Sequence, residues 1–504
     1  MGLLFRQRLS FGVGHVLNDL CASMWFSYLL LFFHKVLKFS NATAGYLLLA
    51  GQIADGIATP LVGYESDRRG NLCNYGRRKT WHLIGTISVI LSFPPLFMRC
   101  IGCSENTPAY AQFIYYVPLV IIFQSGWAAT QINHLALIPE LARDRAEKVN
   151  LNAVRYAFTV LSNILVYCVT WVVFDVSGEG TEQLSEDDIS EFRNIVLIVT
   201  ATGCFFSIIF HIGVKEHTIQ QRFNINNSNI SNSRITEADE NSSLQSTDAN
   251  GSIPDEKTCL LPSIEHSPCN LPMMKWSDWF KRPSFYQMAL LYMCTRLVVN
   301  LSQVYIPMYL TDTLMLSKKY IAIVPLIIYV SGFIATILTN PISKFLRNEV
   351  IYLIGAALVL GACIWSYFLE AFEEETKRDI FFIAVLLGLG TTIILVMCLS
   401  MLSELVGQNT ETGAFVYGSM SLTDKLSNGI AIAVIQNLNP CYCNCDRCGE
   451  FFRAVMGWVV GSIAVIGALA LLIYAFTTKE NDMSEPQGNE IEAEDGNSDV
   501  SINA

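Results

Sequence analysis

Long apolar stretches recur along the chain at the length of a membrane helix. A helix needs about 20 mostly apolar residues to cross the hydrocarbon core of a bilayer. The pattern predicts twelve such spans, near residues 11–33, 43–64, 80–99, 110–137, 150–174, 192–214, 285–311, 320–341, 349–369, 380–403, 412–438 and 452–476. We therefore expect an all-α integral membrane protein of 12 transmembrane helices in two six-helix halves.

Residues 215–283 separate the two sets of spans and differ from them in composition. They include NINNSNISNSRITEADENSSLQSTDANGS, which is polar, poor in aromatic residues and low in complexity. We expect a disordered linker here, between an N-terminal bundle at 1–214 and a C-terminal bundle at 284–477. A disordered tail is expected at 478–504.

The composition agrees with a membrane protein. The 504 residues are 52% hydrophobic and 15% charged, whereas soluble domains carry about 25% charged residues. Cytosolic loops of membrane proteins are rich in Lys and Arg. Cations gather at the N-terminus and in the loops after the second and fourth spans: Arg6, Arg8, Arg68, Arg69, Arg77, Arg78, Lys79, Arg143, Arg145 and Lys148. The bias is weak in the second half, but it predicts that both termini and the linker are cytosolic.

Polar residues also occur inside the spans, where a charge costs about 2.5–3.5 kcal/mol on insertion scales. Helical spacing collects them into one stripe per span. The stripes are His15, Asp19, Ser23 and Ser27; Gln52, Asp55 and Thr59; Gln124 and Gln131; Asn152, Arg155, Thr159 and Ser162; Arg296, Asn300 and Gln303; and Tyr417, Ser421, Lys425 and Asn428. The third, sixth, ninth and twelfth spans carry no charge in their middles.

This division is typical of transporters built from repeats, in which some helices of each repeat line a central site and others support it. We expect the substrate or ion site to comprise Asp19, Asp55, Thr59, Gln131, Arg155, Arg296, Asn300 and Lys425. The two aspartates should pair with Arg155, Arg296 or Lys425 around a wet cavity. The alternative is that the charges only lock helices together. For His15 and His134, packing is favoured over proton transfer.

The segment GYESDRRGNLCNYGRRKTW (63–81) resembles the loop motif of the major facilitator superfamily, Gly-x-x-x-Asp-Arg followed by Gly-Arg-Arg-Lys. The resemblance implies the superfamily's fold and a carrier that works by alternating access. It also implies that the loop joins helix ends on the cytosolic side and steadies one conformation. The gate-loop residues are Gly63, Asp67, Arg68, Gly76, Arg77 and Arg78. The counterpart in the second half, NPISKFLRNEV, is eroded.

Within the superfamily, the spacing resembles the melibiose-permease branch of sugar and cation symporters. That resemblance matches Asp19 to a substrate-binding aspartate and Asp55 to the first of two cation-binding aspartates. It also matches Arg155, in NAVRYAFTV, to the arginine of the fifth helix in that branch. Lys425, in SLTDKLSNG, matches the lysine of the eleventh helix. Thr59 and Gln131 stand where two further acids are expected, which weakens the case for sodium coupling and argues against a sugar substrate.

A closer resemblance covers nearly all of the chain outside the linker, through GHVLNDLCASMWF, IADGIATPLVGYESD, TRLVVNLSQVY and GAFVYGSMSLTDKLSNG. This closer resemblance is to superfamily members that import cysteine from the cytosol into lysosomes and melanosomes. It implies that this import contributes to lysosomal redox balance and, in pigment cells, to pigmentation. A zwitterion suits a cavity with both signs of charge, as do many small polar solutes. A coupling proton, for example on Asp55, or a coupling sodium ion stays open.

Other functions remain as alternatives. The first is a cation-coupled symporter of a sugar or other small polar metabolite, and the second is a membrane scaffold or receptor that transports nothing. No GxxxxGK[ST] loop is present, which argues against an ATP-driven pump. No nucleophile–base set lies at midplane, so we expect no enzyme, no catalytic residue and no cofactor. We expect a monomer.

The linker also contains a candidate sorting signal. DEKTCLL (255–261) fits the acidic dileucine pattern through Glu256, Leu260 and Leu261. Adaptor complexes that sort proteins to lysosomes read this pattern, although short patterns also occur by chance. We expect a multi-pass protein of lysosome and melanosome membranes.

Two loops predicted to be lumenal are rich in cysteine, and disulfides persist in that compartment. The disulfide candidates are Cys100, Cys103, Cys441, Cys443, Cys445 and Cys448. A structural zinc site is the less favoured alternative, and the pairing cannot be deduced from the spacing. Asn41 fits the N-glycosylation pattern in a lumenal loop. Asn226, Asn229 and Asn241 fit it in the linker and should stay unmodified.

Overall fold

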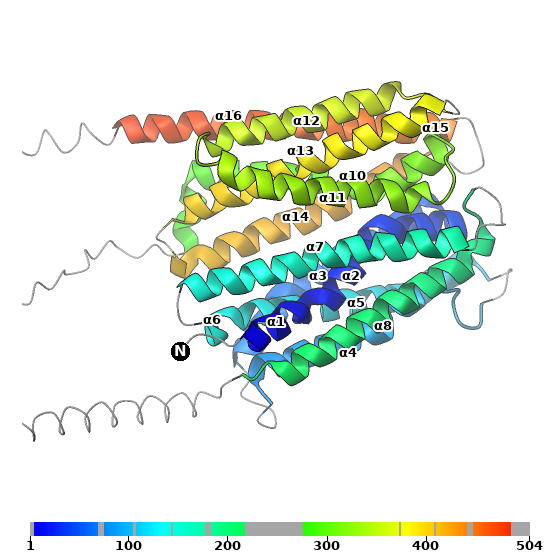
Figure 1. Cartoon of the computed structure of the whole chain (residues 1–504), viewed down its shortest axis with the longest axis horizontal. Helices are drawn as coiled ribbons and strands as arrows, with labels where there is room; N and C mark the ends of the chain where they lie inside the picture. The colour runs from blue at the N-terminus through cyan, green and yellow to red at the C-terminus, as the bar shows by residue number, and fades with distance from the viewer. Residues whose placement is uncertain are drawn as a thin grey trace, which may run out of the picture.

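The computed structural model describes residues 5–68, 75–103, 107–142, 145–176, 183–216, 276–371, 374–407, 410–440 and 447–484. All regular elements in these ranges are helices, which lie side by side along one common direction (Figure 1). A bilayer core offers no water to backbone N–H and C=O groups, so a helix, which bonds them internally, is the form expected for such spans. Most of the predicted linker (217–275) and the tail beyond 484 lie outside the described residues.

The N-terminal half contains six of the long helical stretches. The first is continuous through α1 (Phe5–Gly12), η1 (Val13–His15), α2 (Val16–Met24), η2 (Trp25–Leu29) and η3 (Phe32–Val36). The others are α3 (Asn41–Arg68), α4 (Arg77–Ser92) with η4 (Pro94–Phe97), α5 (Ala109–Ala136) with α6 (Ile138–Leu141), α7 (Arg145–Val176), and η5 (Glu186–Asp188) with α8 (Ile189–Gly213).

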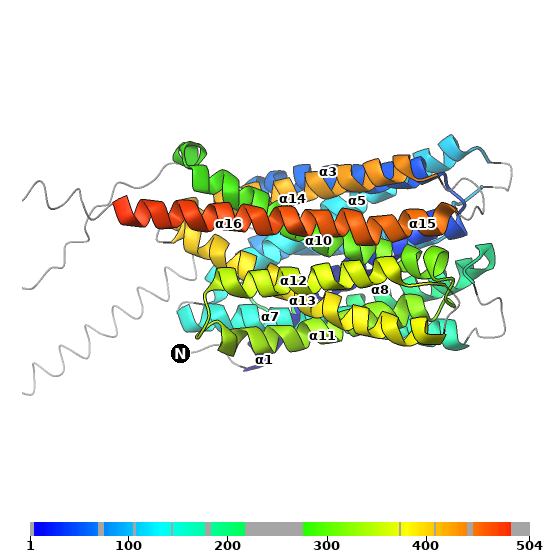
Figure 2. The same ribbon diagram turned by 90° about the horizontal axis from the view of Figure 1, so that it is seen from above.

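The C-terminal half follows the same plan. After η6 (Trp276–Lys281) come α10 (Pro283–Met308) with η7 (Tyr309–Thr313), α11 (Tyr320–Ile342), α12 (Asn348–Phe368), α13 (Glu374–Val406), α14 (Thr410–Leu438), and α15 (Arg447–Ala454) with η8 (Val455–Val459) and α16 (Val460–Ser484). Eleven stretches of the described chain are long and apolar enough to cross a membrane. The remaining long helix, α14, is more polar but packs along α3 in the same bundle (Figure 2).

The two halves lie next to each other in Figure 1, the N-terminal half below and the C-terminal half above. We call the end of the bundle where α1 begins and α16 finishes the terminal end. The opposite end, where α15 lies, is the distal end. The stretches Phe5–Val36 and Pro283–Thr313 are the most deeply buried of the eleven, so the first helix of each half lies at the centre of the molecule.

These two central helices end in the same way. Each finishes in one π-helical segment, η3 and η7, in which the spacing of backbone bonds is wider than in an α-helix. The N–H groups of Leu37 and Leu314 bond to carbonyl groups five residues earlier. A residue with positive φ then follows, Lys38 at 54° and Met315 at 52°. The halves therefore repeat one local structure at the distal end.

Candidate functional site

The polar stripes of the first and fifth spans face each other as a ladder of side-chain contacts. Both helices run from the terminal to the distal end, so residues that recur every four positions on one meet residues with the same spacing on the other. The four contacts are His15 with Arg155, Asp19 with Thr159, Ser23 with Asn163, and Ser27 with Tyr167.

Asp19 lies in the middle of this ladder and is buried. One carboxylate oxygen accepts a hydrogen bond of 2.8 Å from Thr159. The other lies 2.9 Å from Nδ1 of His15. Arg155 reaches Nε2 of His15 at 3.2 Å. The expected direct pairing of Asp19 with an arginine is therefore wrong in this conformation, because the imidazole of His15 lies between the two charges.

A second buried group forms in the C-terminal half around Asp424, which the sequence reasoning missed. Nε of Arg296 donates to Asp424 at 2.8 Å, Asn300 donates at 3.3 Å and Asn428 at 2.5 Å. The sequence suggested that Arg296 pairs with Asp19 or Asp55. In the structure it pairs with Asp424 instead. Asp424 lies next to Lys425, and Asn428 one turn later on the same helix is the sequence signal that points to it.

A third group joins the two halves. Nζ of Lys425 on α14 donates to Asp55 at 2.7 Å and to Thr59 at 2.7 Å, both on α3. The Thr59 hydroxyl donates to the same carboxylate at 3.0 Å. The Trp127 ring lies 5.9 Å from Nζ, where its face attracts the cation. The one ion pair among these three groups that crosses between halves is thus Lys425 with Asp55.

Further polar contacts extend this connection. Gln303 of α10 donates to Ser27 at 3.2 Å and to Tyr167 at 3.4 Å, which ties the last contact of the ladder to the C-terminal half. The Tyr167 ring also packs against Tyr329 of α11. Gln131, also predicted for the site, is half-buried and forms no side-chain hydrogen bond with the described residues.

The gate loop closes around the start of α4. Gly76 has φ of +114°, and Glu216, beyond α8, accepts hydrogen bonds from the backbone N–H groups of Arg78 at 3.1 Å and Lys79 at 3.0 Å. A carboxylate at a helix N-terminus satisfies unpaired N–H groups and complements the helix dipole. A β-carbon on Gly76 would lie 2.5 Å from a Glu216 oxygen, so glycine is required here.

The arginines of the gate loop connect helix ends within the N-terminal half. Arg77 and Arg78 lie 3.3 and 3.6 Å from Glu140 of α6, and Arg78 donates to Ser66 of α3 at 2.7 Å. The remaining members are more local. Arg68 bonds to Tyr64 at 3.3 Å, and the Gly63 carbonyl accepts from Ser66. The Asp67 side chain lies outside the described residues.

Ion pairs between the halves occur at the distal end. Lys35 lies 2.5 Å from Asp312, and Lys318 lies 2.7 Å from Asp188. Asn41 is also buried there, and its side-chain nitrogen donates to the Asn439 carbonyl at 3.3 Å. This nitrogen is the atom that would carry a glycan, and glycosylation of Asn41 stays a prediction.

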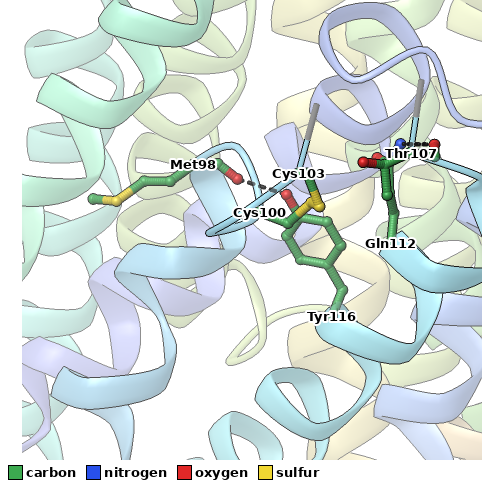
Figure 3. The surroundings of a disulfide bond; sticks show 6 residues. All are labelled: Met98, Cys100, Cys103, Thr107, Gln112 and Tyr116. Carbon is green, nitrogen blue, oxygen red and sulfur yellow. Dashed lines mark hydrogen bonds between the residues drawn. A yellow bond between two sulfur atoms is a disulfide. The ribbon is translucent and has the colours of Figure 1, made fainter. Parts of the chain in front are cut away.

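The described cysteines of the two predicted lumenal loops lie at the distal end. Cys100 and Cys103 form a disulfide between η4 and α5 (Figure 3), beside Tyr116, whose hydroxyl donates to the Met98 carbonyl at 2.6 Å. Cys448 is also disulfide-bonded. The other predicted cysteines, Cys441, Cys443 and Cys445, and the sorting residues Glu256, Leu260 and Leu261 lie outside the described residues.

Known proteins resemble the chain in sequence and in fold. The sequence model of the family described as MFS/sugar transport protein matches residues 10–236. Major facilitator superfamily domain-containing protein 12 of Mus musculus is 43% identical over 493 residues, which cover 95% of this chain and 96% of the mouse protein. The Homo sapiens protein of that name is 44% identical over 477 residues, 92% of each chain. A crystal structure of a D-xylose-proton symporter matches with a TM-score of 0.63 and 16% identity, covering 93% of this chain and 97% of the symporter, a likeness of fold alone.

Proposed function

Because the chain belongs to the major facilitator superfamily of membrane transporters, among the proteins named major facilitator superfamily domain-containing protein 12, we propose that it imports cysteine from the cytosol into lysosomes and melanosomes. Transport proceeds by alternating access, in which the two halves rock around a central site. The activity contributes to lysosomal redox balance and, in pigment cells, to pigmentation.

The observation that carries the proposal is the ion pair of Lys425 with Asp55 and Thr59 across the two halves. When the halves rock apart, these buried charges lose each other, which is costly in a low dielectric. A zwitterionic substrate compensates the loss, because its carboxylate binds the Lys425 ammonium and its own ammonium binds Asp55. Arg155 and Asp19 in one half, and Arg296 and Asp424 in the other, offer further charges of both signs.

The direction of loading follows from where the cations lie. Arg77, Arg78 and Lys79 lie at the terminal end, and Lys and Arg are enriched on the cytosolic side of membranes. In this proposal the terminal end faces the cytosol and the distal end faces the lumen. The ion pairs Lys35–Asp312 and Lys318–Asp188 hold the distal end together, so in this proposal the lumenal side is closed in the conformation described.

The proposed location rests on the linker. Glu256, Leu260 and Leu261 form an acidic dileucine signal that adaptor complexes bind. A linker of this length and composition is accessible to such partners. The carrier works as a monomer in the membrane of lysosomes and melanosomes.

A cation-coupled symporter of a sugar or another small polar metabolite is the second candidate. The description of the matching family model as MFS/sugar transport protein favours it. Thr59 and Gln131 count against it, because they replace two of the acids that the symporter branch uses to hold a cation. Lys425 in contact with Asp55 also occupies the one acid that remains from that set.

Uptake of labelled cysteine into isolated lysosomes tests the proposal. Cells that lack the protein receive the wild type, Lys425→Ala or Lys344→Ala at matched protein levels. Lys344 is an exposed lysine in the turn after α11, so it controls for the loss of one positive charge. We expect the wild type and Lys344→Ala to raise uptake and Lys425→Ala to leave it at background.

Two other results would count against the proposal. If the wild type moves no cysteine, the substrate is wrong, and sugars and other amino acids are measured in the same lysosomes. If Lys425→Ala transports as well as the wild type, the charge pair between the halves is structural, and the site must be sought elsewhere.

A further inference from the structure

The disulfide at the distal end closes a very short loop. Cys100 and Cys103 lie three positions apart in the sequence RCIGC, which is the C-x-x-C arrangement of proteins that exchange thiols and disulfides. The backbone N–H of Cys103 donates to the Cys100 carbonyl at 3.2 Å, which folds the segment into a turn. Gly102 within it has φ of +80°, a conformation that favours glycine. The turn therefore presents a C-x-x-C pair in its oxidised form.

A purely structural role explains this disulfide poorly. A disulfide stabilises a fold mainly by restricting the unfolded chain, and the effect grows with the length of the loop that it closes. This loop is too short for a large effect. The two helices that the turn connects, α4 and α5, already pack along each other. The disulfide therefore adds little to the stability of the fold.

The turn is open to small molecules. The Ile101 side chain is 85% exposed, and no atom of the described residues lies within 4 Å of a β-carbon placed on Gly102. Cys103 is half-buried, whereas Cys100 is buried. A thiolate that arrives from solvent therefore reaches the sulfur of Cys103 first, and Cys100 is the leaving group. Arg99, which is exposed and directly precedes Cys100, is a cation of the kind that favours thiolates.

The same turn is connected to the end of the first helix through Tyr116 of α5. The Tyr116 hydroxyl donates at 2.6 Å to the carbonyl of Met98, two residues before Cys100 (Figure 3). The Tyr116 ring packs edge-on against Phe33 and Phe39, with centroid distances of 5.2 and 5.7 Å. All three rings are buried. A change in the turn therefore reaches these two phenylalanines through one side chain.

Phe33 and Phe39 flank the segment that supplies a cation to the other half. Phe33 lies in η3 and Phe39 follows it, and the Phe39 N–H donates to the Phe33 carbonyl at 2.9 Å. Lys35 lies between them in the chain, and its ammonium is 2.5 Å from Asp312 of η7. Tyr116 thus holds the segment that closes the distal end, and its own position depends on the turn that the disulfide closes.

We propose that Cys100 and Cys103 exchange disulfide bonds with small aliphatic thiols at the distal end, and that reduction of the pair weakens the closure of that end. Cysteine, the substrate proposed above, is such a thiol. Product that collects on the distal side then reduces the pair, the carrier spends less time closed on that side, and uptake from the other side slows. This feedback rests on the proposed function, whereas the exchange itself does not.

The reaction balances with the small thiol and its disulfide as the only reagents. The thiolate of a first small thiol attacks the Cys103 sulfur, the S–S bond breaks, and Cys100 leaves as a thiolate that takes up the proton lost by the incoming thiol. A second small thiolate attacks its counterpart in the mixed disulfide, which releases the small disulfide and leaves a thiol on Cys103. One protein disulfide and two small thiols thus give two protein thiols and one small disulfide. The reverse reaction, with the small disulfide as oxidant, restores the pair.

The first measurement follows the sulfur atoms of the full-length protein in lipid nanodiscs. The ratio of cysteine to cystine, and separately of mercaptoethanol to its disulfide, is varied, and free thiols are alkylated and located by mass spectrometry. We expect Cys100 and Cys103 to become reduced together as either ratio rises. In Cys100→Ser, cystine should form a mixed disulfide on Cys103, whereas Cys103→Ser should leave the buried Cys100 unmodified. A pair that stays oxidised in an excess of both thiols overturns the proposal.

The second measurement follows the distal end by hydrogen exchange in the same nanodiscs. We expect reduction to quicken exchange of the Phe39 amide about fivefold, the factor that loss of one net hydrogen bond gives. The amide of Val214, which bonds to the Phe210 carbonyl at the terminal end, should not quicken. If both amides quicken, or neither does, the pair does not govern closure of the distal end and the proposal is overturned.

Two variants assign the response to the pair and to Tyr116. Cys100→Ala/Cys103→Ala is the matched control, because it lacks the pair and keeps the other cysteines, and its Phe39 amide should exchange rapidly in both buffers. Tyr116→Phe keeps the ring but not the bond to Met98, so it should keep the thiol exchange and lose the effect of reduction on Phe39. A redox response of Phe39 that persists in the double variant comes from other cysteines and overturns the proposal. If the pair responds to mercaptoethanol while the wild type imports no cysteine, only the proposed function is refuted.

Discussion

Inside the membrane, a charged side chain is tolerated only with a partner, and the buried carboxylates of Asp19, Asp55 and Asp424 each meet that demand differently. Asp19 uses a hydroxyl and an imidazole, Asp55 uses a lysine from the other half, and Asp424 uses an arginine and two amides. The amide donors matter because a buried carboxylate has several lone pairs to satisfy. Asp424 is the most fully bonded of the three.

Removal of the Asp424 carboxylate should therefore destabilise the protein. Asp424→Leu leaves the half-buried Arg296 guanidinium without its counter-charge; breaking one partner of a fully buried pair costs about 3–5 kcal/mol, which is an upper bound here. Replacing both partners by apolar residues removes the uncompensated charge, so Arg296→Met/Asp424→Leu should recover most of the loss. Thermal unfolding of the purified protein in detergent measures both. A double variant as unstable as the single one would contradict this account.

The sequence indicates the charged residues more readily than it indicates their partners. Sequence reasoning found Asp19, Asp55, Arg155, Arg296 and Lys425 because a charge inside an apolar run is conspicuous by its cost. It could not assign partners, because helical spacing fixes which residues share a face but not which helix that face meets. The position of His15 between Asp19 and Arg155 depends on how two helices pack, which one sequence does not contain.

At the scale of helices, close crossings recur at equivalent places in the two halves. A β-carbon on Gly85 of α4 would lie 2.6 Å from the Gly126 carbonyl oxygen of α5. A β-carbon on Gly390 of α13 would lie 2.8 Å from the Gly355 carbonyl oxygen of α12. Membrane helices associate largely by packing, and small residues let their backbones approach closely. These two helix pairs are therefore held at backbone contact.

Gly85→Ala should accordingly destabilise the protein. The added methyl group would overlap a backbone carbonyl that cannot move aside, and overpacking of this kind costs about 1–3 kcal/mol. Gly361→Ala is the matched control, because nothing lies within 4 Å of its added carbon and alanine favours helix over glycine by about 1 kcal/mol. In detergent, the free energy of unfolding of Gly361→Ala should equal or exceed that of the wild type, and that of Gly85→Ala should be lower. The reverse order would contradict the backbone contact between α4 and α5.

The helices themselves were largely predictable. Apolar runs of span length located the eleven described stretches that are apolar enough to cross a membrane. The sequence also predicted the span at 412–438, which the structure describes as the more polar helix α14. The π-helical segments η3 and η7 were not foreseen. A shift from four-residue to five-residue bonding over one turn leaves no clear mark on the hydrophobic pattern of a sequence.

At the scale of the whole molecule, the repeated ends of the two central helices form a device that holds the halves together. Lys35 is the fourth residue of η3 and Asp312 the fourth of η7, so equivalent positions carry opposite charges and meet at 2.5 Å. A contact between equivalent positions lies at the axis that relates the halves. It is made only while the distal end is closed, and Lys318 with Asp188 reinforces it.

Removing both cations should therefore shift the protein toward the opposite conformation. In Lys35→Ala/Lys318→Ala, hydrogen exchange should quicken at the distal backbone amides of Phe39 and Leu316 and slow in the gate loop, because one end opens as the other closes. The exchanged pair Lys35→Asp/Asp312→Lys restores opposite charges at equivalent positions, so it should behave as the wild type. Faster exchange at the distal end without protection of the gate loop would mean local fraying, and the ion pairs would then stabilise loops without governing access.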